Sequence, residues 1–193
     1  MEEMLTIFDE ELNPIGAAPR SLVHQEGLLH EVAHIWAASR IEGAWWLWFQ
    51  QRAFDKADFP GYYDTAVGGH IAAGEEVLPA AVREMGEEIG LFPQPEALLF
   101  VGSHRDEVHI PGFFSREVAR VYLYQDDAPK FAPGEEVERM VRIRLDDFSI
   151  LSAGGNAEAV DEAGNRFSLN YSQFCIAGQE FEALIKPFVE QMR

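Results

Sequence analysis

Three glutamates, Glu84, Glu87 and Glu88, stand at positions i, i+3 and i+4 of a stretch with helical periodicity. On a helix these positions share one face, so the three carboxylates would lie close together. Like charges at that spacing repel one another and cost stability unless cations lie among them. A partial set of hard oxygen ligands suits Mg²⁺ or Mn²⁺, which keep waters and also take substrate phosphates. The alternative is a solvated acidic helix face, the commoner role of a charge run.

The helix that carries these glutamates is predicted to run from about Val77 to Ile89. Pro79 suits its first turn, and Gly90 suits the cap at its C-terminal end. Arg83 directly precedes the glutamates and is placed to orient a carboxylate through paired hydrogen bonds. Most of the buried face is predicted to come from four apolar residues: Ala80, Ala81, Met85 and Ile89. Gly86 indicates close packing at the middle of the helix.

Apolar and β-branched runs predict the strands that surround this helix. They cover residues 5–8, 32–38, 44–51, 98–102, 116–124 and 140–144, and the second and third are expected to form a hairpin. Apolar residues at helical spacing from Phe181 to Val189 predict an amphipathic C-terminal helix over 178–192. Strands and helices mix without a regular βαβ rhythm, which favours an α+β fold with a mixed sheet flanked by helices.

Length and composition limit the classes of protein that this chain can be. The 193 residues, 47% of them hydrophobic, fit one globular domain over 1–193, with an N-terminal strand or hairpin extension over 1–30. Fifteen basic residues against 33 acidic ones give a net charge of −18, which disfavours a stable complex with nucleic acid or anionic lipid. The single cysteine, Cys175, excludes an intrachain disulfide. No apolar run approaches about 20 residues and the start is acidic, so we expect a cytoplasmic protein.

The segment 69–91 resembles the Nudix box. The box is a glycine, five residues, a glutamate, seven residues, Arg-Glu, an aliphatic residue, any residue, Glu-Glu, any residue, a glycine and an aliphatic residue. These positions are occupied here by Gly69, Glu75, Arg83, Glu84, Met85, Glu87, Glu88, Gly90 and Leu91. None of the required positions departs from the pattern, so the resemblance is highly specific.

The resemblance implies an α/β/α sandwich around a mixed sheet and hydrolysis of a nucleoside diphosphate linked to another group. It assigns Glu84, Glu87 and Glu88 as catalytic, metal-binding residues, with the backbone carbonyl of Gly69 as a further ligand of Mg²⁺ or Mn²⁺. Glu75 and Arg83 are implied to support the box. Members of the family are often dimers, so a homodimer is an open possibility for this chain.

Upstream of the box, the chain is similar to isopentenyl-diphosphate isomerases, a divergent branch of the same superfamily. The similarity lies in Gln51-Arg52-Ala53-Phe54-Asp55-Lys56, in Pro60-Gly61 and in Gly69-His70. It implies that Arg52 and Lys56 contact a substrate diphosphate, a role that suits both side chains. It also makes His24, His30 and His70 candidates for a three-histidine metal site; structural histidines are the alternative. His34, on an alternating apolar stretch, is interpreted as a core residue.

One departure favours a hydrolase over an isomerase. The isomerase catalytic cysteine directly precedes the Gly-His pair, where this chain has Gly68. Glycine has no side chain to move a proton at carbon, and Cys175 is distant in sequence. The predicted activity is therefore a metal-dependent diphosphohydrolase (pyrophosphatase) acting on a nucleoside di- or triphosphate or a related small diphosphate. An isomerase and a non-catalytic ligand-binding domain remain the alternatives.

The sequence leaves the general base open. Glu84 is the first candidate within the box, and outside it Glu135, Glu136 and Glu138 follow Pro133-Gly134 in an expected loop. Asp106 and Glu107 are alternatives in another expected loop, and solvated surface carboxylates are the alternative for all of them. Among the aromatic residues, core packing explains most of Trp45, Trp46 and Trp48, with nucleobase stacking as the alternative. Phe113 and Phe114 are other candidate loop aromatics.

Overall fold

The computed structural model describes residues 2–176 and 178–192 of the chain. Within these residues eleven strands form one mixed sheet, whose main path is β11-β10-β9-β4-β3-β1-β2. The strands are β1 (Met4–Phe8), β2 (Pro14–Pro19), β3 (Leu29–Ile41), β4 (Ala44–Arg52), β5 (Tyr63–Thr65), β6 (Val67–His70), β7 (Leu98–Ile110), β8 (Phe113–Gln125), β9 (Val137–Arg144), β10 (Asn156–Asp161) and β11 (Arg166–Asn170).

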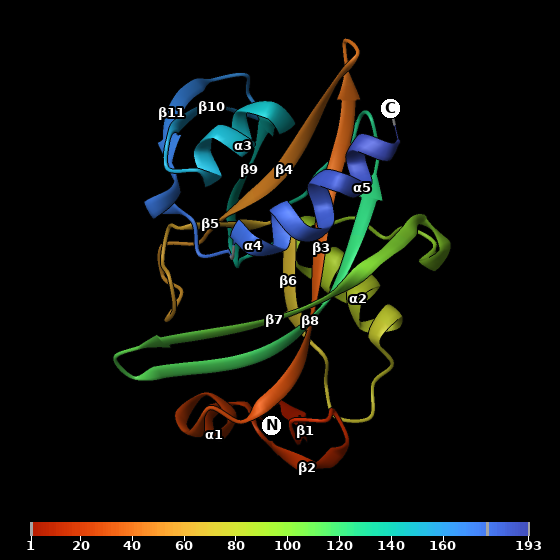
Figure 1. Cartoon of the computed structure of the whole chain (residues 1–193), viewed down its shortest axis with the longest axis vertical. Helices are drawn as coiled ribbons and strands as arrows, with labels where there is room; N and C mark the ends of the chain where they lie inside the picture. The colour runs from red at the N-terminus through yellow and green to blue at the C-terminus, as the bar shows by residue number, and fades with distance from the viewer. Residues whose placement is uncertain (1, 177, 193) are drawn as a thin grey trace.

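Helices cover both faces of this sheet. They are α1 (Arg20–Glu26), α2 (Val77–Ile89), α3 (Leu145–Ser152), α4 (Gly178–Glu180) and α5 (Lys186–Gln191), with 3₁₀ turns at Pro95–Ala97 and Tyr171–Gln173 and a π-helical turn at Phe181–Ile185. Figure 1 shows α2 behind the sheet and the C-terminal helices in front of it. The architecture is the mixed α+β sandwich that the sequence predicts.

Two apolar clusters lie on the opposite faces of the sheet. On one face Ala81, Met85 and Ile89 of α2 pack against Trp48 of β4 and its neighbours. On the other face α3 and the C-terminal helix pack against Trp45 and the adjoining strands. Successive side chains of a strand point to opposite faces, which is why Trp45 and Trp48 belong to different clusters. Trp45 and Trp48 are therefore core residues, as the core-packing interpretation holds, whereas Trp46 is half-buried and lies in neither cluster.

The long strand β3 organises the sheet around the central part of the molecule. It pairs antiparallel with β4 and β6, and parallel with β8. The strands β7 and β8 form a hairpin that extends beyond the body of the molecule in Figure 1. Because β6, which begins the loop before α2, lies against β3, the acidic helix is held close to the residues of β3 and β8.

The helix α2 begins and ends at the predicted residues. Gly90 caps it in the left-handed conformation at φ 70°, and its N–H bonds to the carbonyl of Gly86. A Cβ on Gly86 would lie 2.1 Å from a ring carbon of Phe92, which confirms close packing there. The C-terminal segment is helical as predicted, except that a π-helical turn interrupts it at Phe181–Ile185.

One expectation about local structure is wrong. Asp106 and Glu107 lie in strand β7 rather than in a loop, because the β7–β8 ladder continues to Ile110. Residues 14–16 belong to strand β2, in which Pro14 and Gly16 pair with β1. The short stretch 147–151, for which the sequence predicts no element, lies in helix α3. Among the described residues, no helix is long and apolar enough to cross a membrane.

Candidate active site

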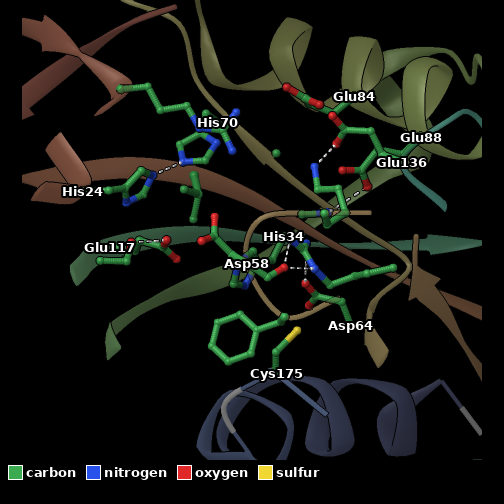
Figure 2. Close-up of a pocket in the computed structure, with 18 of the residues that line it drawn as sticks. His24, His34, Asp58, Asp64, His70, Glu84, Glu88, Glu117, Glu136 and Cys175 are labelled. Atoms are coloured by element: carbon green, nitrogen blue, oxygen red, sulfur yellow. Dashed lines mark hydrogen bonds and ion pairs between the residues drawn. The ribbon is translucent and has the colours of Figure 1, made fainter. Parts of the chain in front are cut away.

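A cavity of about 520 Å³ gathers most of the residues that the sequence singles out. Its walls come from α1, β3, the loop after β4, β6, α2, the β7–β8 hairpin and the segment before α4 (Figure 2). The predicted site residues that line it are His24, Arg52, Lys56, Gly69, His70, Arg83, Glu84, Glu87, Glu88, Asp106, Phe113, Glu135 and Glu136. Neither Glu107 nor Glu138 lines this cavity, and the same holds for Trp45, Trp46, Trp48 and Phe114.

Arg83 ties the loop before α2 to the acidic helix. Its guanidinium donates to Glu75 at 3.0 and 2.9 Å and to the carbonyl of His70 at 3.3 Å. The same group donates to Glu84 at 2.7 Å and to Glu87 at 2.9 Å. A planar guanidinium can satisfy several acceptors at once, so one residue fixes the relative positions of three carboxylates.

Two of the three box glutamates are buried. Glu88 accepts hydrogen bonds from Gln50 Nε2 at 2.8 Å and from the N–H of Gly68 at 3.2 Å. Burial, and then the charges of Glu84 and Asp64, raise the pKa of Glu88 to about 8. Burial also raises the pKa of Glu84, although Arg83 opposes the shift. Buried carboxylates that repel one another favour a bound cation, so this set fits a hard divalent metal.

Gly69 lies directly against one of these carboxylates. A Cβ at this position would lie 2.2 Å from both Cγ and Cδ of Glu84, closer than two carbons can approach. Glycine is therefore required where the strand β6 meets the acidic helix, because the backbone has to pass close to the carboxylate. This close approach places the peptide of Gly69 beside Glu84, as a shared metal site would require.

The basic residues of the cavity are already engaged with neighbouring groups. Arg52 donates through Nε and Nη2 to the carbonyl of Asp58 at 3.2 and 2.9 Å, and its Nη1 lies 3.6 Å from Asp64. Lys56 Nζ lies 2.6 Å from Glu136. Arg20 also lines the cavity, a residue that the sequence reasoning missed because its position in α1 is remote from the box.

Three histidines cluster at the wall between α1, β3 and β6. The ligand atoms of His24, His30 and His70 all lie within 4.8 Å of one another, and Nε2 of His24 lies 3.0 Å from Nε2 of His70. His24 Nδ1 and His30 Nε2 are buried without a hydrogen-bond partner. Burial, then the neighbouring His30 and Arg20, lowers the pKa of His24 to about 4, and burial also lowers that of His70.

Neutral imidazoles are the form that binds metal, and orphaned ring nitrogens gain a partner when they do. The cluster therefore fits a divalent cation with nitrogen ligands. Glu117 on β8 lies next to it, with Oε1 at 3.9 Å from Nε2 of His30. Phe113 stacks on His24 with ring centroids 4.6 Å apart, which closes one side of the cluster.

Four further residues line the cavity although the sequence reasoning did not place them there. They are His34, Asp64, Glu117 and Cys175. The interpretation of His34 as a core residue is wrong, because its side chain faces the cavity and pairs with Glu180 at 2.9 Å. The view of Cys175 as remote is also wrong, since tertiary contact brings it beside the cavity, where Sγ lies 3.4 Å from the carbonyl of Tyr63. No local pattern in the sequence indicates these four positions.

Comparison with known proteins gives consistent similarities. The family model for the NUDIX domain matches residues 29–162. An uncharacterized Nudix hydrolase of Clostridium acetobutylicum is 32% identical over 178 residues, which are 88% of this chain and 86% of that protein. An isopentenyl-diphosphate Delta-isomerase of Serratia proteamaculans is 34% identical over 137 residues, 70% of this chain and 73% of that protein.

Among solved structures, a protein of Deinococcus radiodurans superposes with a TM-score of 0.56 at 23% identity. The match covers 79% of this chain and 91% of that one. At this level of identity the match concerns the fold alone. The overall fold is thus similar in a protein of low sequence identity.

Proposed function

Because this chain belongs to the NUDIX domain family, we propose that it hydrolyses the diphosphate linkage of a nucleoside di- or triphosphate or a related small diphosphate. The observation that carries the proposal is a single cavity that holds both the buried glutamates of α2 and the cations Arg52 and Lys56. Carboxylates alone would repel a diphosphate. In this cavity the glutamates can bind it through a metal cation, and Arg52 and Lys56 can bind its phosphoryl oxygens directly.

Glu84, Glu87 and Glu88, with the carbonyl of Gly69, are the residues that would hold Mg²⁺ or Mn²⁺. When bound, such a cation cancels phosphate charge and lowers the pKa of a coordinated water. Arg52 and Lys56 would orient the phosphoryl groups, and Arg83, which Glu75 anchors, holds Glu84 and Glu87 in position. Glu84 is our first candidate within the box to accept a proton from the attacking water, because its carboxylate lines the cavity beside Glu87 and Glu88.

Among the loop acids, Glu136 is better placed than Glu138 to take part in the reaction. Its carboxylate reaches Lys56 at the cavity, whereas Glu138 does not line it. The stacking role for the tryptophans is not proposed further, since none of them lines the cavity. Among the described residues, Phe59 and Phe113 are the phenylalanines that line it, so either ring is available to a nucleobase or another apolar group. A cytoplasmic location and a homodimer stay predictions.

The experiment is a phosphate-release screen over nucleoside diphosphates, nucleoside triphosphates and isoprenoid diphosphates, with and without Mg²⁺ or Mn²⁺. We expect release that disappears in chelator and returns with metal. Glu87→Gln should weaken calorimetric metal binding, while Glu158→Gln, on an exposed strand position away from the cavity, serves as the matched control. Full turnover in chelator would contradict the proposal, and ligand binding without turnover would favour a non-catalytic binding domain.

The isomerase is the second candidate, favoured by the histidine cluster and by Cys175 at the same cavity. Against it, residue 68 is a glycine, and burial raises the pKa of the Cys175 thiol well above its usual range. A buried, protonated thiol is poorly prepared to remove a proton from carbon. Supplying isopentenyl diphosphate with Mg²⁺ should give no dimethylallyl isomer, and efficient conversion would replace the hydrolase proposal.

A further inference from the structure

The side chain of His34 is oriented from behind by a buried carboxylate. Its Nδ1 lies 2.9 Å from Oε2 of Glu180, which belongs to the short helix α4 and is 146 residues away in the chain. Oε1 of Glu180 accepts a hydrogen bond from Nε1 of Trp36 at 2.6 Å. Glu180 is only 3% exposed and does not line the cavity. Both of its oxygens are therefore used inside the protein: Oε2 contacts the histidine ring, and Oε1 is fixed by the indole of Trp36.

A buried carboxylate is costly unless a cation compensates it, so the pair is stable when both partners are charged. Burial alone would lower the pKa of His34, but Glu180, with Glu117 and Asp64, outweighs it and raises that pKa to about 10. Burial likewise acts to raise the pKa of Glu180, but His34 and Trp36 hold it below its usual range. The buried ion pair with Glu180 therefore favours the imidazolium form of His34.

The other ring nitrogen of His34 is free to act on a ligand. Among residues 2–176 and 178–192, Nε2 has no hydrogen-bond partner, and the side chain lines the cavity and is 17% exposed. By contrast, Lys56 already contacts Glu136 and Arg52 already donates to a carbonyl. Of these three side chains, His34 is the one whose ion-pair partner, Glu180, is buried in the core and does not line the cavity. Its remaining N–H donor is therefore available without breaking an existing contact.

Gly68 keeps the ring accessible from the neighbouring strand. It is the register partner of His34 in the β3–β6 ladder. A Cβ built on Gly68 would lie 4.0 Å from Cδ2 of His34 and 3.8 Å from Oδ2 of Asp64, with nothing nearer. The absence of a side chain at this position thus leaves room beside the imidazolium. A ligand oxygen can occupy that room.

We propose that His34 is a substrate-binding residue that donates a charge-assisted hydrogen bond from Nε2 to a phosphoryl oxygen, and that Glu180 is its positioning residue. The inference rests on the proposed diphosphate substrate but assigns to this chain a cation outside the box and outside the Arg52–Lys56 segment. Because Asp64 and Glu117 also face His34, the bond discriminates in favour of an anion that arrives together with its metal and against a free one.

The test measures binding of inorganic pyrophosphate in saturating Mg²⁺ by calorimetry, independently of turnover. His34→Gln should weaken this binding by about ten- to a hundred-fold, the loss expected for one charge-assisted bond. Mn²⁺ binding without pyrophosphate should stay unchanged in that variant. His109→Gln is the matched control, since His109 is an exposed histidine that does not line the cavity. Equal pyrophosphate affinity in the two variants would overturn the proposal.

A second measurement keeps the proposal testable if His34→Gln does not fold. In ¹⁵N-histidine NMR spectra of the wild-type chain, Mg²⁺-pyrophosphate should shift the Nε2 resonance of His34. Glu180→Gln should turn the imidazolium into a neutral ring at neutral pH and weaken pyrophosphate binding. A His34 resonance that does not respond to pyrophosphate would refute the contact. If pyrophosphate binds through His34 but no diphosphate is hydrolysed, the proposed function fails and the binding role stands.

Discussion

Replacing Gly69 by alanine tests whether the acidic helix is a metal site whose geometry depends on one backbone position. The new Cβ would lie 2.2 Å from Cγ and Cδ of Glu84. Carbon atoms make favourable contact at roughly 3.5 Å, so the glutamate has to move by about 1.3 Å. Metal–ligand distances tolerate only about 0.2 Å, so this displacement removes Glu84 from the ligand set.

We therefore expect Gly69→Ala to weaken Mg²⁺ or Mn²⁺ binding by at least about ten- to a hundred-fold. The cost to unfolding free energy should be smaller, about 1–3 kcal/mol, because a side chain at the edge of a cavity can be displaced without disrupting the core. Calorimetric metal titration in the absence of substrate measures the first effect. Thermal melting in chelator measures the second.

The adjacent glycine supplies the matched control. A Cβ on Gly68 meets nothing closer than 3.8 Å, and neither glycine has a positive φ that an alanine would resist. Gly68→Ala also keeps the backbone N–H that donates a hydrogen bond to Glu88. It should leave metal affinity and melting temperature near those of the wild type. Wild-type metal affinity in Gly69→Ala, or an equal loss in both variants, would refute the steric reasoning.

Three further predictions concern the charged groups of the cavity. The pKa of Glu88 is raised from 4.5 to about 8, so the metal-free protein should lose stability as pH rises through that window. Glu88→Gln should therefore melt at least about 2–4 °C higher than the wild type in chelator near pH 8. This is the shift that a gain of about 1 kcal/mol in unfolding free energy gives in a domain of this size. A lower melting temperature would count against a strained carboxylate. The raised pKa of His34 gives a pH dependence of the same sign in a higher window: its contribution to stability is complete below 6.5 and is lost as pH rises toward about 10. Urea unfolding at a series of pH values should show this decline in the wild type and not in His34→Gln; parallel curves would contradict the ion pair. In Arg83→Lys the lysine cannot reach the three carboxylates together. Chemical denaturation should show an unfolding free energy lower by about 1–2 kcal/mol, and metal binding should be weaker. An unchanged variant would mean that solvent screens the network.

The local features of the acidic helix were predictable from the sequence. Its length, its capping glycine and the common face of Glu84, Glu87 and Glu88 depend on residues within about one or two turns of one another. The mixed sheet with helices on both faces followed from the order of apolar runs, and the resemblance to the Nudix box agreed with it. Arg52 and Lys56 were found only through the isomerase resemblance, because nothing local shows that a loop cation faces the box.

The rest of the cavity was decided by tertiary structure alone. Strand β3 is covered on both faces, so its apolar pattern could not show that His34 faces a cavity while its neighbours face the core. Its partner Glu180 lies 146 residues away, and Cys175 and Asp64 likewise reach the cavity through contacts that have no period in the sequence. Spacing along a chain determines which side chains share an element. Only the packing of one element on another determines which charges meet, because that distance is fixed by the sheet and not by the number of residues between them.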